Sequence, residues 1–173
     1  MDSLFNVLIA VLPSAIVFLT AFFFLKKMTE NEYRKQMIEF KSNNQKNIIP
    51  LRLQAYERIS IFLERIHPNA MIMRTYKQGM SARLLQAELL KNIRTEYEHN
   101  VAQQIYMSKP VWDGVKAAKE ETIKIVNIAA ARVGDEASGA DLSKMIIDMS
   151  SQLEKIPSDF ALEILKREVK TLF

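Results

Sequence analysis

The stretch LFNVLIAVLPSAIVFLTAFFFL, residues 4–25, decides the fold that the sequence predicts. It contains no charged residue and is followed at once by Lys26 and Lys27. At a rise of about 1.5 Å per residue, its roughly 22 residues form a helix of roughly 33 Å, and the hydrocarbon core of a bilayer is about 30 Å thick. The stretch therefore predicts a transmembrane anchor over residues 1–27.

Three other interpretations of this stretch compete with an anchor. A lipoprotein signal needs a cysteine, and the chain has none. A cleaved signal peptide needs a basic start and small residues at the cleavage site, whereas this chain opens with Met1, Asp2 and Ser3 and runs through phenylalanines into lysines. A buried core helix that is apolar on all sides is uncommon in a small soluble domain. The anchor is the favoured interpretation.

Charge predicts the orientation of this anchor. No Lys or Arg precedes it, several follow it, and basic flanks stay on the cytoplasmic side of a membrane. We expect a single-pass protein of the cell inner (cytoplasmic) membrane, with the amino terminus outside and the carboxy-terminal domain in the cytoplasm. The residues expected at the membrane surface are Lys26, Lys27, Arg34 and Lys35.

Small and weakly polar residues fall near one stripe of the predicted anchor. Such residues let helix backbones approach closely in lipid. The stripe predicts packing against another transmembrane helix through Asn6, Ala10, Ser14, Val17 and Ala21.

Composition limits the chemistry of the remaining chain. It has no cysteine, which excludes disulfides, thiolate nucleophiles and Cys-ligated metal sites. The net charge of +4 is mild and suits lipid headgroups better than nucleic acid. We therefore expect no nucleic-acid partner, and no small-molecule substrate is indicated.

Residues 28–50 are predicted to form a juxtamembrane helix or linker. Tyr33, Met37 and Phe40 recur at helical spacing and form a narrow apolar seam that needs a partner. Its partner is one of the later helices, a second copy of the chain, or the membrane surface. Pro50 and the polar residues before it predict a break between about residues 42 and 50.

Residues 51–173 are predicted to form a cytoplasmic domain of about five helices. Apolar residues recur with a period near 3.6 over 51–66, 81–107, 109–133, 141–156 and 158–173, and Pro, Gly and Ser separate these segments. Residues 70–80 are the least regular part. The predicted fold class is all-α, with one amino-terminal transmembrane helix followed by a helical bundle.

A repeated Glu-Arg pair lies on the first helix of this domain. Glu57 and Arg58 recur seven residues later as Glu64 and Arg65, and none of these glutamates sits three or four residues from an arginine. Their counter-ions come either from water and neighbouring helices or from a partner protein. With the seam, these four residues form the predicted partner-binding surface.

One polar cluster has a spacing with chemical meaning. Glu96 and His99 form a Glu-x-x-His pair, as in di-metal helical bundles, and Glu98 lies between them. Those sites need a second such pair, but the only other histidine, His67, lies before a proline that ends a helix. We therefore expect no metal, no cofactor and no catalytic set.

The chain resembles a family of uncharacterised bacterial proteins with one amino-terminal transmembrane helix. The stretches that carry the resemblance are LRLQAYERISIFLERI, EYEHNVAQQIYMS, VWDGVKAAKEE and ILKREVKTLF. The resemblance supports the domain boundaries and implies no activity.

The function predicted from the sequence is a non-enzymatic accessory or scaffold subunit of a cytoplasmic-membrane complex. Its expected partners are other membrane or membrane-associated subunits, including a second copy of itself, and the lipid bilayer. The alternative is a membrane-tethered helical enzyme or metal-binding protein that uses Glu96, Glu98 and His99.

Overall fold

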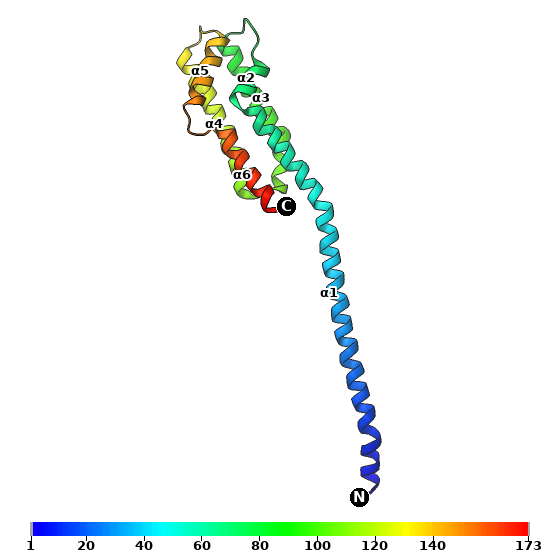
Figure 1. The fold of residues 1–173 in the computed structure, drawn as a ribbon. Coiled ribbons are helices and arrows are strands. Elements are labelled where there is room, and N and C mark those ends of the chain that lie inside the picture. The colour runs from blue at the N-terminus through cyan, green and yellow to red at the C-terminus, as the bar shows by residue number, and fades with distance from the viewer. Residues whose placement is uncertain (1, 173) are drawn as a thin grey trace. The chain divides into compact units, whose positions relative to one another are not determined.

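The computed structural model describes the backbone of residues 2–172, and the side chains of residue 13 and of residues 15–40 and 46–172. Over this range the chain is all-helical, as the sequence predicts (Figure 1). The elements are α1 (Asp2–Ile66), α2 (Pro68–Thr75), α3 (Ala82–Asn100), the 3₁₀ helix η1 (Val101–Tyr106), α4 (Lys109–Val133), α5 (Gly139–Ser151) and α6 (Pro157–Leu172). The chain divides into two compact units, Met1–Ile49 and Pro50–Phe173, and each is described by itself.

The first unit corrects the predicted membrane anchor. Within the described residues, no helix has an apolar stretch long enough to cross a membrane. The predicted transmembrane helix is therefore wrong, and so is the inner-membrane localisation with an outside amino terminus. The side chains of residues 4–12 and 14 lie outside the described residues.

The predicted break before residue 51 is also absent from the described backbone. α1 continues from residue 42 through Pro50 to Ile66, and Pro13 lies inside it as well. A proline removes one donor from the helix, at a cost of about 3 kcal/mol, but the other i to i−4 bonds remain. Pro50 instead marks the first residue of the second unit.

The second unit is a helical bundle built around α4. This helix packs against α3, α5 and α6, while α2 contacts α3 and α5 (Figure 1). The core contains α1 residues at the predicted helical spacing, among them Ile59, Phe62 and Ile66, and they lie in one cluster with Trp112 of α4. The predicted helical bundle is confirmed.

Local signals set the ends of several helices. The Ser81 hydroxyl accepts a hydrogen bond from Leu84 N, and Ser138 forms a capping box with Asp141. The connections before α3 and α5 meet in an isolated β-bridge between Ser81 and Ser138. The predicted helix over 81–107 ends as α-helix at Asn100 and continues as η1.

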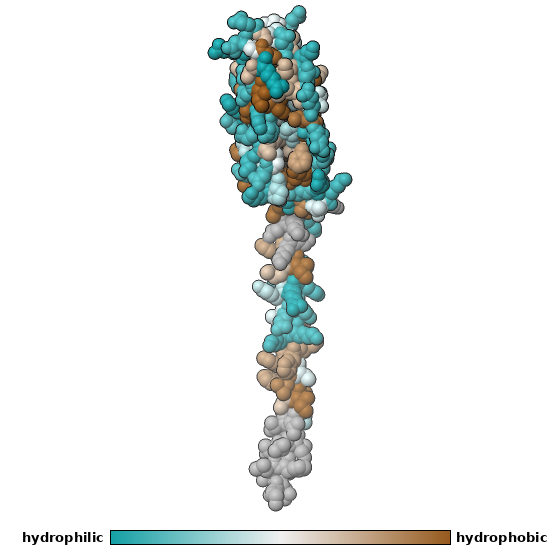
Figure 2. All heavy atoms as spheres, turned by 90° about the vertical axis from the view of Figure 1, so that its left-hand side faces the viewer, coloured by the Kyte–Doolittle hydropathy of each residue, from teal (hydrophilic) through white to brown (hydrophobic). Residues whose placement is uncertain are grey.

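On the face of the second unit that Figure 2 shows, charged and polar side chains surround smaller areas of apolar surface. This mixture is ordinary for protein surfaces, so the apolar areas alone identify no binding site.

Candidate functional site

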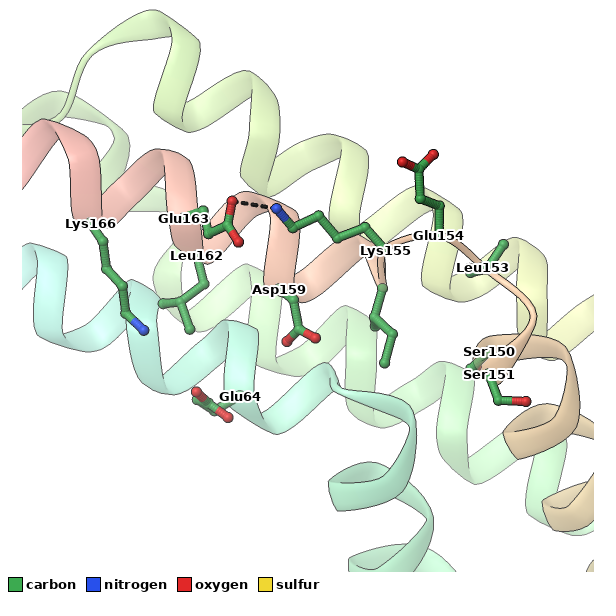
Figure 3. Close-up of a pocket in the computed structure, with 11 residues that line it drawn as sticks. Glu64, Ser150, Ser151, Leu153, Glu154, Lys155, Asp159, Leu162, Glu163 and Lys166 are labelled. Carbon is green, nitrogen blue, oxygen red and sulfur yellow. Dashed lines mark hydrogen bonds and ion pairs between the residues drawn. The ribbon is translucent and has the colours of Figure 1, made fainter.

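The second unit contains an open groove bounded by α1, the α5–α6 connection and α6, which we call the α6 groove (Figure 3). Its volume is about 550 Å³. Its lining combines apolar, hydroxyl and charged side chains. They are Glu64 of α1, Ser150 and Ser151 of α5, Leu153, Glu154, Lys155 and Ile156 of the connection, and Asp159, Leu162, Glu163 and Lys166 of α6.

The groove exists because α5 stops before α6 begins. The Ser150 hydroxyl donates to Ile146 O at 2.8 Å in the last turn of α5, and Pro157 then starts α6. Proline suits a first helical position because the amide hydrogen that it lacks has no partner there. The connecting residues 152–156 form one wall, and Ser150 and Leu162 are buried at the base of the groove.

Some charged side chains of the groove form ion pairs within the chain. Lys155 donates to Glu163, and Arg167 Nη2 lies 3.6 Å from Glu163 Oε2. The hydrogen bond from Lys155 is the main cause that lowers the pKa of the Glu163 carboxyl. Asp159 Oδ2 lies 3.9 Å from His67 Nε2, beyond hydrogen-bond distance.

Other charged side chains of the groove form no ion pair in the described structure. Glu64, Glu154 and Lys166 make no ion pair with any side chain that the structure describes. Figure 3 shows Asp159 and Lys166 pointing from α6 toward α1, whereas Glu154 points away from them. The lining holds four carboxylates and two lysines, so it is locally acidic although the whole chain carries +4.

The chemistry of the lining suits the binding of a cation. The groove is open, and carboxylates outnumber lysines in its lining. Carboxylates on two helices above a small apolar base can hold a cationic side chain together with an apolar one. A segment of another protein can supply both, with a Lys or Arg side chain beside an apolar residue.

The predicted Glu-Arg surface is divided by the structure. Arg65 Nη1 donates to Glu96 Oε1 at 2.7 Å, and Arg58 Nη2 donates to His99 O at 3.3 Å. The two arginines therefore tie α1 to α3. Glu57 and Glu64 are exposed, and only Glu64 lines the α6 groove.

Of the predicted residues of the first unit, Tyr33 and Arg34 line one open pocket, together with Thr29 and Glu30. The seam residues Tyr33, Met37 and Phe40 are exposed, as are Val17 and Ala21 of the predicted packing stripe. The side chains of Asn6, Ala10 and Ser14 lie outside the described residues. The basic residues Lys26, Lys27, Arg34 and Lys35 are exposed as well.

The structure does not join Glu96, Glu98 and His99 through hydrogen bonds or ion pairs between their side chains in the described residues. The Glu96 carboxylate is engaged by Arg65, while Glu98 and His99 are exposed. Across the described part of the chain, no group of three or more His, Cys, Asp or Glu side chains is placed to hold a metal ion.

Sequence reasoning missed a second polar cluster, formed by Arg52, Tyr56, Ser108 and Glu168. Glu168 Oε1 accepts hydrogen bonds from Tyr56 OH at 2.7 Å and from Ser108 N at 3.0 Å, and Ser108 Oγ donates to Glu168 Oε2. Arg52 Nη2 donates to Tyr56 OH at 2.7 Å. Arg52 and Tyr56 lie four residues apart on α1, but no local spacing connects this pair with Ser108, which precedes α4, or with Glu168 of α6.

The titration of this cluster follows from its contacts. Burial raises the pKa of Glu168, but hydrogen bonds from Ser108 and Tyr56 and the charge of Arg52 outweigh it and leave the pKa lowered. Burial, with the hydrogen bond to Glu168, raises the pKa of Tyr56. The folded state therefore favours a charged Glu168 beside a neutral Tyr56.

Together, the fold and the groove define an all-α protein with an open, charged surface site. The chain belongs to a family of unknown function, DUF7935, whose model matches residues 2–172. This match confirms the expectation of an uncharacterised family. No curated protein and no solved structure matches the chain.

Proposed function

We propose that this protein is a non-enzymatic accessory subunit that binds a partner protein through the α6 groove. The supporting observation is the excess of acidic side chains in an open groove, with Glu64 and Asp159 on facing helices and neither held by a close ion pair in the described structure. The partner supplies a segment with a Lys or Arg side chain and a neighbouring apolar residue. The acidic groove attracts this segment, and its apolar base buries the apolar side chain.

Several sequence-based predictions remain open beside this proposal. Binding through Tyr33, Met37 and Phe40, a contact through Glu57, and self-association stay predictions. A bacterial origin of the family also stays a prediction.

Charge reversal at the groove tests the proposal. Glu64 is exposed and makes no ion pair in the described structure, so Glu64→Lys is expected to leave the fold intact and to repel a cationic partner segment. The matched control is Glu136→Lys, because Glu136 is also exposed and lies outside the groove. The measurement is the mass of the native particle and the identity of the proteins that co-purify with the full chain from its own source.

The expected result is a particle larger than the chain in the wild type and in Glu136→Lys, and its loss in Glu64→Lys. A partner that is retained equally by both variants would place the contact elsewhere. A clean monomer in the wild type would contradict the proposal itself.

A further inference from the structure

The two halves of α6 are held to the bundle in different ways. Its buried residues, Ser158, Ala161, Leu162 and Leu165, all lie at or before residue 165, and none lies in residues 166–172. Beyond Leu165, Val169 is only partly buried and Leu172 is 41% exposed. Little apolar burial therefore holds residues 166–172 in place.

A polar contact holds this second half instead. The Glu168 side chain is only 13% exposed, and its carboxylate accepts three hydrogen bonds, from Tyr56 OH, Ser108 N and Ser108 Oγ. Arg52 Nη2 adds a positive charge 3.8 Å from Glu168 Oε1. Hydrogen bonds to a charged group are stronger than those between neutral groups.

The donors around Glu168 are positioned without help from α6. Arg52 Nε donates to Tyr106 O at 3.0 Å, and Arg52 Nη2 donates to Tyr56 OH. Tyr56 belongs to the hydrophobic core, and Ser108 is the residue that precedes α4. The guanidinium, the phenol and the serine therefore form a preorganised set of donors for one carboxylate.

We propose that Arg52, Tyr56 and Ser108 form a carboxylate-binding site, that Glu168 occupies it, and that this contact fastens residues 166–172 as a strap. When the strap opens, the rest of the second unit stays folded, because the fully buried residues of α6 lie before Glu168 and only the partly buried Val169 follows it. The open site presents the same donors to a carboxylate from another molecule. Glu168 is then an intramolecular competitor for that ligand.

Hydrogen exchange of the full chain tests the strap. In Glu168→Ala, the backbone amides of residues 166–170 are expected to exchange at least about tenfold faster, the effect of losing bonds to a charged group. Exchange in α3 and α4 is expected to stay at the wild-type rate. The control is Asp159→Asn, which removes a half-exposed carboxylate charge from the first turn of the same helix. Asp159 makes no ion pair with residues 166–172 among the described side chains, so this variant is expected to leave these amides unchanged.

Acetate tests the vacated site. In Glu168→Ala, sodium acetate is expected to raise the thermal midpoint above that in sodium chloride of equal ionic strength. Adding Arg52→Met or Tyr56→Phe to that variant is expected to abolish the difference. Acetate is expected to give no such difference in the wild type, because Glu168 fills the site.

Two results would overturn the proposal. Wild-type exchange of residues 166–170 in Glu168→Ala would show that no strap is fastened there. Equal midpoints in acetate and chloride would show that the donors do not bind a carboxylate. If Glu168→Ala fails to fold, residues 166–172 do not open separately from the bundle. Ser108→Ala, which removes one donor, would then destabilise all helices together, and that result would also overturn the proposal.

Discussion

The ion pair between Arg65 and Glu96 decides whether the Glu-Arg surface of α1 faces a partner or its own bundle. We predict that Arg65→Ala and Glu96→Ala are not additive in their effects on the free energy of unfolding. Arg65 Nη1 lies 2.7 Å from Glu96 Oε1, and the two side chains are 50% and 23% exposed. Because solvent screens such a pair, the coupling energy is expected to be about 0.5–1 kcal/mol.

The assay is urea unfolding of the wild type, both single variants and the double variant, followed by circular dichroism. Arg58 and Glu98 provide a matched control cycle, since Arg58 bonds to the backbone of His99 and Glu98 is exposed. That cycle is expected to be additive. A coupling energy near zero for Arg65 and Glu96 would refute the reasoning. Arg65 would then be available to bind a partner, as the sequence predicts.

Three further predictions concern the bundle. The lowered pKa of Glu168 means that its stabilisation is present above the unfolded-state pKa of about 4.3 and is lost as pH falls through the folded-state pKa. As the pH is lowered from about 5 to about 2, the midpoint temperature of thermal unfolding is therefore expected to fall less steeply in Glu168→Gln than in the wild type. Parallel plots of midpoint against pH for the two proteins would contradict this. Gly139→Ala is expected to cost about 1–3 kcal/mol, because its Cβ would lie 2.9 Å from Met80 O, a backbone atom. Gly114→Ala is expected to be nearly neutral in the same unfolding assay, since its Cβ would meet the flexible Ile164 Cδ1 at 3.3 Å and alanine favours the helix.

The helices of the second unit could be predicted because their signals are local. Apolar spacing near 3.6 located the core face of α1, and Ser81, Pro110, Gly134 and Pro157 mark helix ends within two residues of where they lie. The change from α3 to η1 at Val101 has no comparable signal. The break predicted at Pro50 was wrong because a proline disfavours a helix locally, whereas a long helix retains the hydrogen bonds on both sides of the proline.

The contacts between distant segments could not be predicted. Sequence reasoning excluded counter-ions three or four residues away and left neighbouring helices as one source, but it could not name Glu96, which follows Arg65 by 31 residues. Glu168 follows Tyr56 by 112 residues, so only the folded bundle brings their side chains together. The α6 groove depends in the same way on the packing of α6 near the end of α1.

A site-specific crosslink tests the groove as a protein-binding site most directly. The chain has no cysteine, so Ser151→Cys places a single thiol in the α6 groove for a photoreactive label, and Thr95→Cys places one on an exposed site of α3 outside it. We predict that the label at residue 151 captures one defined protein in the native source, that the label at residue 95 does not, and that adding Glu64→Lys and Asp159→Lys abolishes the capture. Capture at both positions, or capture at residue 151 that survives the charge reversal, would contradict a partner-binding role for the groove.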